Sequence, residues 1–348
     1  GRTIRAVDDV SFEIRPGEIV GLVGESGSGK SVSAMSTIRL VPNPPGRVEK
    51  GEVIFDGKNL LTLPIEELRK IRGKEISVIF QEPMTALSPL HPVGQQLAEV
   101  VRIHEPETSR EAAMERAVEW LGKVGIPDPA ERAKAYPFQF SGGMRQRVMI
   151  AMALILHPRL IIADEPTTAL DVTLQAQIFD LILAMKAEDT SILFITHDMG
   201  VIWELADRVL VMKGGRLIEE GEVEPLFSDP QQEYTRELLA AVPRLTDVPR
   251  VSDPRPEGAA PLIEVRDLKT WFPVKRGVFA RTVDWVRAVD DVSIDVYPGE
   301  CLGLVGESGS GKTTLGRSIL GLETSQSGEI LYAGENIRGL GYHAMRPY

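Results

Sequence analysis

The chain has 348 residues, 43% of them hydrophobic, and its 39 Lys and Arg against 50 Asp and Glu give a formal net charge of −11. This length and hydrophobic content suit two domains of ordinary size and argue against disorder or a coiled coil. The acidic balance argues against a main role in nucleic-acid binding, and the single cysteine excludes an intramolecular disulfide, a cysteine-based zinc site and a Cys-ligated iron–sulfur cluster.

Two nearly identical segments divide the chain. RAVDDVSFEIRPGEIVGLVGESGSGK ends at Lys30 and recurs as RAVDDVSIDVYPGECLGLVGESGSGK, which ends at Lys312. The spacing is that of a whole domain, so it predicts a duplicated domain rather than a solenoid. Residues 243–261 carry five prolines and little apolar content, which is typical of a semi-extended linker. We therefore expect a first domain at 1–242, a linker at 243–261 and a second domain at 262–348.

In chain order, the first domain begins with an apolar strand at 19–23, a glycine loop and a helix. Further buried strands are predicted at RLIIA and SILFIT, and this alternation favours an α/β fold with a parallel sheet. From about 84 to 140 the pattern changes to helical stretches broken by prolines, which predicts a helical insertion. The second domain is expected to be truncated, and the first to lack its opening strand. The longest apolar run, nine residues from Val148 to Leu156, is far short of the roughly 20 needed to span a bilayer, so any membrane role is expected to be peripheral.

Both glycine loops, GESGSGKS and GESGSGKT, fit the pattern G-x-x-x-x-G-K-S/T and are predicted to follow an apolar strand directly. Glycines let backbone N–H groups surround phosphate oxygens, the lysine reaches the outer phosphates, and Ser31 or Thr313 can ligate Mg²⁺. A chance glycine turn is the alternative, and two copies in the same context argue against it. The predicted nucleotide ligands are Gly24, Glu25, Ser26, Gly27, Ser28, Gly29, Lys30 and Ser31 in the first loop, and Gly306, Glu307, Ser308, Gly309, Ser310, Gly311, Lys312 and Thr313 in the second.

Other polar residues lie where apolar strands end. Asp164 and Glu165 follow one buried strand, where one carboxylate can hold Mg²⁺ and the other can polarise a water. A helix-capping acidic pair is the simpler interpretation of these two residues. Gln81 and His197 follow other strands and could reach the same edge, although a single histidine at a strand end more often has a structural role.

A further anion site is predicted at FSGGMRQRVMIAMALI. Ser141 can cap an apolar helix whose first residues are glycines, so its exposed N–H groups face an anion. An ordinary capped helix is the alternative. One nucleotide does not need two helix N-termini from one domain, which favours a site completed by a facing subunit.

The order glycine loop, Gln81, SGGMRQ, ADEPTTALD, ITHD resembles the nucleotide-binding domain of ATP-binding cassette transporters. This resemblance implies tandem cassettes of the P-loop NTPase fold, with a RecA-like parallel-sheet core, an antiparallel β edge and an inserted helical subdomain. It implies ATP and Mg²⁺ as cofactors, with ATP held between two cassettes paired head to tail.

The resemblance also implies residue roles. Catalytic roles fall to Glu165 as base, His197 as γ-phosphate contact and Gln81. The Mg²⁺ ligands would be Ser31, Gln81, Asp164 and Thr313, and the signature comprises Ser141, Gly142, Gly143 and Gln146. Asp171 would lie at the dimer interface, and Phe272, together with its neighbour Trp271, would stack on adenine.

Within the family, FQEPMTALSPLHPVGQQL, DEPTTALDVTLQAQI and QQEYTRELLAAVPR are similar to ATPases of dipeptide, oligopeptide, nickel and glutathione importers, and WFPVKRG before the second cassette resembles the fused glutathione-import type. That implies a peripheral protein on the cytoplasmic face of the bacterial inner membrane, with two transmembrane permease subunits, an extracytoplasmic solute-binding protein and no nucleic acid as partners. The alternative is a soluble tandem cassette acting on ribosomes or DNA. A long charged or coiled-coil connector would be expected there, whereas this linker is short and Pro-rich. A regulatory cassette that does not hydrolyse ATP is disfavoured because Glu165 and His197 are both present.

Overall fold

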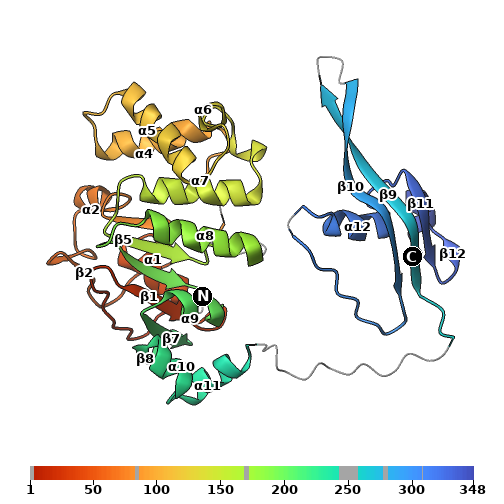
Figure 1. Cartoon of the computed structure of the whole chain (residues 1–348). Coiled ribbons are helices and arrows are strands. Elements are labelled where there is room, and N and C mark those ends of the chain that lie inside the picture. Colours follow the sequence, from red (N-terminus) through yellow and green to blue (C-terminus); the bar gives the residue numbers. More distant parts are fainter. Residues whose placement is uncertain (1–3, 83–85, 168–171, 243–257, 277–280, 308) are drawn as a thin grey trace. The chain divides into compact units, whose positions relative to one another are not determined.

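The computed structural model describes residues 4–82, 86–167, 172–242, 258–276, 281–307 and 309–348. The chain divides into two compact units, Gly1–Asp247 and Val248–Tyr348, called here the first and second units (Figure 1). The domain limits at 1–242, 243–261 and 262–348 stay predictions. So does the helical subdomain at about 84–140.

A six-stranded sheet in the order β4-β5-β6-β1-β7-β8 forms the centre of the first unit. Neighbouring strands from β4 to β7 are parallel, and β8 pairs antiparallel with β7 at the edge. This confirms the predicted parallel core with an antiparallel edge. Its strands are β1 (Ile19–Val23), β4 (Ile76–Ile79), β5 (Leu160–Asp164), β6 (Ser191–Ile195), β7 (Arg208–Lys213) and β8 (Arg216–Glu222).

The central strands are mostly apolar, as is typical of a parallel sheet that is covered on both faces. Val20 and Leu22 of β1 pack into one apolar cluster, whereas Val23 packs into another, and all three are fully buried. The helices of the described residues between β1 and β5 include α1 (Lys30–Thr37), α2 (Ile65–Ile71), α4 (Val93–His104), α5 (Arg110–Lys123) and α7 (Gly142–Leu154). After β5 come α8 (Val172–Met185), α9 (Met199–Leu205), α10 (Val223–Ser228) and α11 (Glu233–Ala240).

Within the range predicted as a helical insertion lie α4, α5, the short α6 (Pro129–Arg132) and a 3₁₀ turn at Pro137–Gln139. Figure 1 shows these helices together at one end of the first unit, with α7 beneath them. Trp120 and Leu121 of α5 are buried in the same apolar cluster as Val148 and Ile150 of α7. A small hairpin, β2 (Ile54–Phe55) and β3 (Lys58–Asn59), precedes α2 and turns at an Asp-Gly pair with positive φ at both residues.

The second unit is built on an antiparallel sheet in the order β10-β9-β11-β12. Its elements are β9 (Ile263–Arg276), β10 (Arg281–Val296), α12 (Lys312–Ile319), β11 (Ser327–Tyr332), β12 (Glu335–Asn336) and α13 (Tyr342–Met345). Val265 and Leu268 of β9, Val289 of β10, Leu315 of α12 and Ile330 of β11 form its apolar core. The glycine loop thus begins α12 on one side of a small sheet.

One prediction for the second unit is wrong. The segment before its glycine loop, 301–305, forms no strand, and Leu302, Leu304 and Val305 are exposed. The equivalent segment of the first unit is β1, which is hydrogen-bonded to β6 on one side and β7 on the other. A β-strand needs partners for its backbone groups, and no described strand lies beside 301–305.

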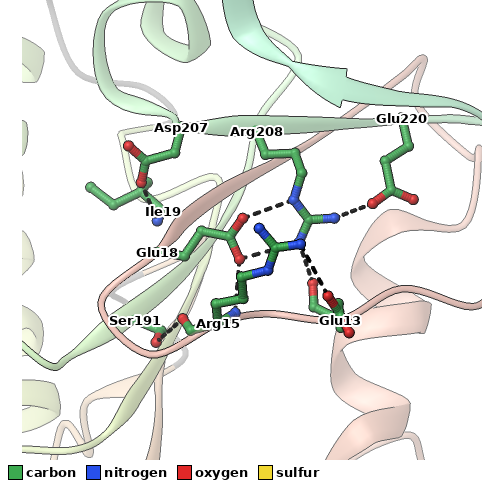
Figure 2. Close-up of polar contacts among 8 residues, drawn as sticks. All are labelled: Glu13, Arg15, Glu18, Ile19, Ser191, Asp207, Arg208 and Glu220. Atoms are coloured by element: carbon green, nitrogen blue, oxygen red, sulfur yellow. Dashed lines mark hydrogen bonds and ion pairs between the residues drawn. The ribbon is translucent and has the colours of Figure 1, made fainter.

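Arg208, the first residue of β7, connects the sheet to the irregular segment that precedes β1 (Figure 2). Its Nε donates to Glu18 Oε1 at 2.8 Å, and its other nitrogens donate to the Glu13 carbonyl at 2.6 Å and to Glu220 Oε1. The side chains of Arg208 and Glu18 are each only 11% exposed. The network therefore holds three segments together at the end of the sheet where its parallel strands begin.

The ionisation of Glu18 makes this network sensitive to pH. Burial acts to raise the pKa of the Glu18 carboxyl, but hydrogen bonds from Arg208 and from the backbone N–H of Arg15, with their positive charges, together hold it below its usual value. A lowered pKa in the folded chain means that Glu18 contributes stability above the unfolded-state pKa of about 4.3. That contribution disappears as the pH falls through the lowered value.

Replacement of Arg208 by Met is expected to lower the free energy of unfolding near neutral pH by about 3 kcal/mol, because it leaves the Glu18 carboxylate buried without its cation. Below pH about 4.3 the difference from the parent should shrink, since Glu18 becomes protonated. Urea unfolding followed by circular dichroism, once near neutral pH and once below pH about 4.3, measures both effects. Arg216→Met removes a far more exposed ion pair with Asp8 and should cost little; a loss for Arg208→Met that is equal at both pH values would contradict the role of Glu18.

None of the helices in the described parts of the chain combines the length and apolar character needed to cross a bilayer.

Candidate active site

The first glycine loop connects β1 to α1 and adopts a backbone that only glycine permits at several positions. Gly24, Gly27 and Gly29 have φ of 145°, 81° and 102°. A Cβ on Gly24 would lie 2.1 Å from the Met212 carbonyl oxygen, and one on Gly29 would lie 2.4 Å from that of Ala6. β7 and the N-terminal segment therefore leave no room for a side chain at Gly24 or Gly29, whereas at Gly27 only the positive φ favours glycine.

Lys30 closes the loop from within. Its Nζ donates to the carbonyl oxygens of Gly24 at 2.7 Å and Glu25 at 2.9 Å, and the residue is only 6% exposed. Burial lowers the pKa of the Lys30 ammonium, while the carboxylates of Glu165 and Asp164 act in the opposite direction. The cation is thus aimed along the loop, where an anionic ligand would replace part of its lost hydration.

The second loop has the same internal geometry. Lys312 Nζ donates to the carbonyl oxygens of Gly306 and Glu307, at 2.6 Å in both cases. Gly306, Gly309 and Gly311 have φ of 153°, 82° and 94°, close to the values in the first loop. A Cβ on Gly311 would lie 2.0 Å from the Ala288 carbonyl oxygen, just as Gly29 faces Ala6. Ser308 lies outside the described residues, and Thr313 is exposed at the start of α12.

Asp164 lies at the end of β5 beside the start of α1. Its Oδ1 accepts a hydrogen bond from Ser31 Oγ at 2.8 Å. Burial raises the pKa of the Asp164 carboxyl and the neighbouring charge of Glu165 adds to this, whereas the Ser31 hydroxyl and Lys30 oppose it. A hydroxyl and a buried carboxylate whose charged form is disfavoured fit a hard divalent cation, because the cation would favour the carboxylate. The residues present therefore suit Mg²⁺.

Glu165 lies between two polar side chains from neighbouring strands. Its Oε2 accepts a hydrogen bond from Gln81 Nε2 at 2.9 Å, and His197 Nδ1 lies 3.3 Å from its Oε1. Glu165 has φ of 44°, which is uncommon for a residue with a side chain, and its N–H donates to the Ile195 carbonyl at 2.9 Å. The structure thus brings all three predicted catalytic residues together at the carboxyl ends of the parallel strands, the end from which the first glycine loop extends.

The predicted signature residues begin α7. Ser141 is exposed and its Oγ accepts a hydrogen bond from the Met144 N–H at 3.3 Å, as expected for a helix cap. Gly142 is open to solvent, whereas a Cβ on Gly143 would lie 2.5 Å from Leu174 Cδ2. No hydrogen bond or ion pair in the described parts of the chain joins Ser141 to the first glycine loop.

Gln146 differs from the other signature residues because it is 2% exposed and its amide donates to the Pro166 carbonyl. This contact links α7 to the residue that follows Glu165.

The two other predicted site residues are Asp171 and Phe272. Asp171 lies outside the described residues. Phe272 is 39% exposed on β9 and pairs with Val286 of β10, in the same unit as the second glycine loop. Its neighbour Trp271 is engaged instead, with its Nε1 donating to Asp290 Oδ1 at 3.1 Å and the Arg287 guanidinium 4.8 Å from its ring centroid.

Sequence reasoning missed several residues that support the site. Tyr234 of α11 accepts a hydrogen bond from the Glu25 N–H, although the two are 209 positions apart. Asp198 caps α9 directly after His197 and receives the N–H groups of Gly200 and Val201. The Asp-x-x pattern before an apolar helix could have indicated this cap, whereas nothing in the sequence points to the Tyr234 contact.

Comparisons with known proteins agree with this geometry. A protein-family model described as ABC transporter matches residues 7–168 and 289–347. The chain is 50% identical over 349 residues to the peptidoglycan transport ATP-binding protein YejF of Agrobacterium fabrum (strain C58), covering all of the chain and 62% of that protein. It is 47% identical over 361 residues to the glutathione import ATP-binding protein GsiA of Escherichia coli (strain K12), covering 96% of the chain and 58% of that protein. The chain thus spans less than two thirds of the length of these relatives.

Among solved structures, the ATP-binding cassette MJ0796, in a dimeric post-hydrolysis state with ADP and Pi, has a TM-score of 0.57 at 31% identity and covers 64% of this chain and 92% of its own. The family model covers more than half of the chain, and it spans both glycine loops and the Asp164–Glu165 pair. The chain therefore belongs to the ABC transporter family.

Proposed function

We propose that this chain binds and hydrolyses ATP and that hydrolysis drives the import of a small solute through a membrane transporter. The observation that carries the proposal is the meeting of Gln81, Glu165 and His197 at the end of the sheet where the first glycine loop, with Lys30 and Ser31, contacts Asp164. A cradle for phosphates and a carboxylate placed to take a proton from water are two parts that nucleotide hydrolysis uses.

In the proposed mechanism the first loop binds the phosphates of ATP through its backbone N–H groups and Lys30. Ser31 and Asp164, with Gln81 nearby, would hold Mg²⁺, which when bound neutralises charge on the phosphate oxygens. Glu165 accepts a proton from the attacking water. Gln81 and His197 hold that carboxylate in place through contacts of 2.9 Å and 3.3 Å.

We further propose that two cassettes complete each site. The exposed start of α7, with Ser141, Gly142 and Gly143, supplies backbone N–H groups for the nucleotide held on the opposite cassette. The two loops with matched lysine geometry supply the phosphate sites. Asp171 would lie at the interface between cassettes, and Phe272 would stack on the adenine at the second loop.

The solute is proposed from the relatives. Their names assign peptidoglycan transport to one and glutathione import to the other. Both cargoes contain peptide bonds, which favours a peptide-like solute. The proposed assembly comprises two transmembrane permease subunits and an extracytoplasmic solute-binding protein, with the chain bound peripherally at the cytoplasmic face of the bacterial inner membrane. Ribosomes and DNA are not among the proposed partners, because the relatives are transport proteins and the chain is acidic.

Uptake into cells that lack the gene tests this function. Labelled glutathione, a dipeptide, a peptidoglycan-derived peptide and nickel are supplied to the deletion strain, complemented either by the parent gene or by one encoding Lys30→Ala. We expect the deletion strain to lose uptake of one peptide-like solute. The parent gene should restore that uptake and the variant should not, because the variant cannot bind the phosphates of ATP. Unchanged uptake of all four in the deletion strain would contradict a role in importing these solutes.

A further inference from the structure

The last helix of the first unit is hydrogen-bonded to the first glycine loop. The Glu25 N–H donates to the Tyr234 hydroxyl at 3.1 Å, and Tyr234 is only 6% exposed although it lies in the first turn of α11. The Nζ of Lys213, the last residue of β7, lies 4.2 Å from the centroid of the same ring. A buried tyrosine hydroxyl placed on a backbone N–H fixes the path of the loop at its second residue.

α11 has its own attachment to the edge of the sheet, so Tyr234 is held firmly. The N–H groups of Gln231 and Gln232, just before α11, donate to the Glu219 carboxylate of β8 at 2.8 Å and 3.2 Å. The turn between β7 and β8 also contacts the first glycine loop, because the Gly215 N–H donates to the Ser28 carbonyl at 2.8 Å. The loop is therefore held from two directions by segments that are themselves tied together.

We propose that Tyr234 is a positioning residue that couples the first glycine loop to α11, so that nucleotide binding at this loop stabilises α11. The inference rests on the proposed function, since it assumes that the loop binds nucleotide phosphates. Part of the ordering that phosphate binding demands of the loop is supplied in advance by the Tyr234 hydroxyl. By linkage, a nucleotide that favours the ordered loop must favour the docked α11 to the same extent.

The test uses the whole chain carrying Lys312→Ala, so that binding of MgADP reports on the first loop. Tyr234→Phe keeps the buried ring and removes only the hydroxyl. We expect the dissociation constant for MgADP, measured by calorimetry, to rise about three- to tenfold, as expected for the loss of one hydrogen bond. Hydrogen exchange of the peptide that spans α11 should slow on addition of MgADP in the parent, and this protection should be lost in Tyr234→Phe.

Two controls separate positioning from a general loss of stability. Tyr348→Phe removes a tyrosine hydroxyl that donates to Glu335 in the second unit and should change neither the affinity nor the protection. The thermal midpoint of Tyr234→Phe should stay close to that of the parent, since its ring still fills the site. Unchanged or tighter MgADP binding in Tyr234→Phe, with α11 protected as in the parent, would overturn the coupling while leaving the proposed function intact. Failure of the parent to bind MgADP would overturn both.

Discussion

Replacing Glu165 by Gln should reduce the rate of ATP hydrolysis about 10²- to 10³-fold while leaving ATP affinity nearly unchanged. The amide has almost the shape of the carboxylate and can still meet Gln81 and His197, whose contacts with Glu165 are 2.9 Å and 3.3 Å. It cannot accept a proton from water, however, so the chemical step loses its base. The phosphate contacts of Lys30 and the loop are untouched, so bound ATP should persist and hold paired cassettes closed.

Phosphate release, measured in the transporter assembled with its membrane partners, gives the rate, and ATP affinity is measured separately under the same conditions. Glu204→Gln is the matched control, because it makes the same change on an exposed face of α9. Its hydrolysis rate should equal that of the parent. A Glu165→Gln variant that hydrolyses ATP at close to the parent rate would remove this residue from the role of base.

The glycine loops could be predicted from the sequence because their conformation is locally encoded. Both copies have nearly the same φ at their glycines, and both lysines donate to the same two carbonyls of their own loop. This agreement holds although one loop follows a buried strand and the other follows an exposed, irregular segment. The positive φ values that glycine permits and the short reach of the lysine are sufficient to specify the loop.

The strands of the two repeats show where local prediction fails. RAVDDVS forms part of β10 in the second unit, where β9 pairs with it, whereas the same letters in the first unit form no strand. The reverse holds for GLV, which ends β1 between β6 and β7 in the first unit and is irregular in the second. Identical residues thus take different backbones because strand formation depends on hydrogen-bond partners that are distant in sequence.

The sequence predicted which residues form the catalytic site better than it predicted their geometry. The carboxyl ends of parallel strands meet at one edge, so Gln81, Glu165 and His197 were expected to be close. The positive φ of Glu165, which sets the direction of its carboxylate, has no local sequence signal because most such positions carry glycine or asparagine. The contact between Tyr234 and Glu25 has none either, since it depends on how α11 packs after the whole sheet has formed.

Replacing Lys30 by Ala should weaken nucleotide binding at the first loop by about 100-fold or more, since it removes a charge-assisted contact to phosphate together with the ties that close the loop. In the parent, Lys30 Nζ already bridges the Gly24 and Glu25 carbonyls at 2.7 Å and 2.9 Å, so the variant loses loop order as well as charge. Hydrogen exchange of the peptide covering the first loop and α1, with and without MgADP, measures the effect site by site.

The second loop offers a control of the same chemistry. Lys312 makes the same contacts with Gly306 and Glu307, so Lys312→Ala removes an equivalent lysine from the other unit. MgADP should still protect the first loop in Lys312→Ala and should fail to do so in Lys30→Ala. Equal protection of the first loop in the two variants would show that its phosphate contacts do not depend on Lys30. The role proposed for Lys30 in holding the phosphates at this loop would then fail.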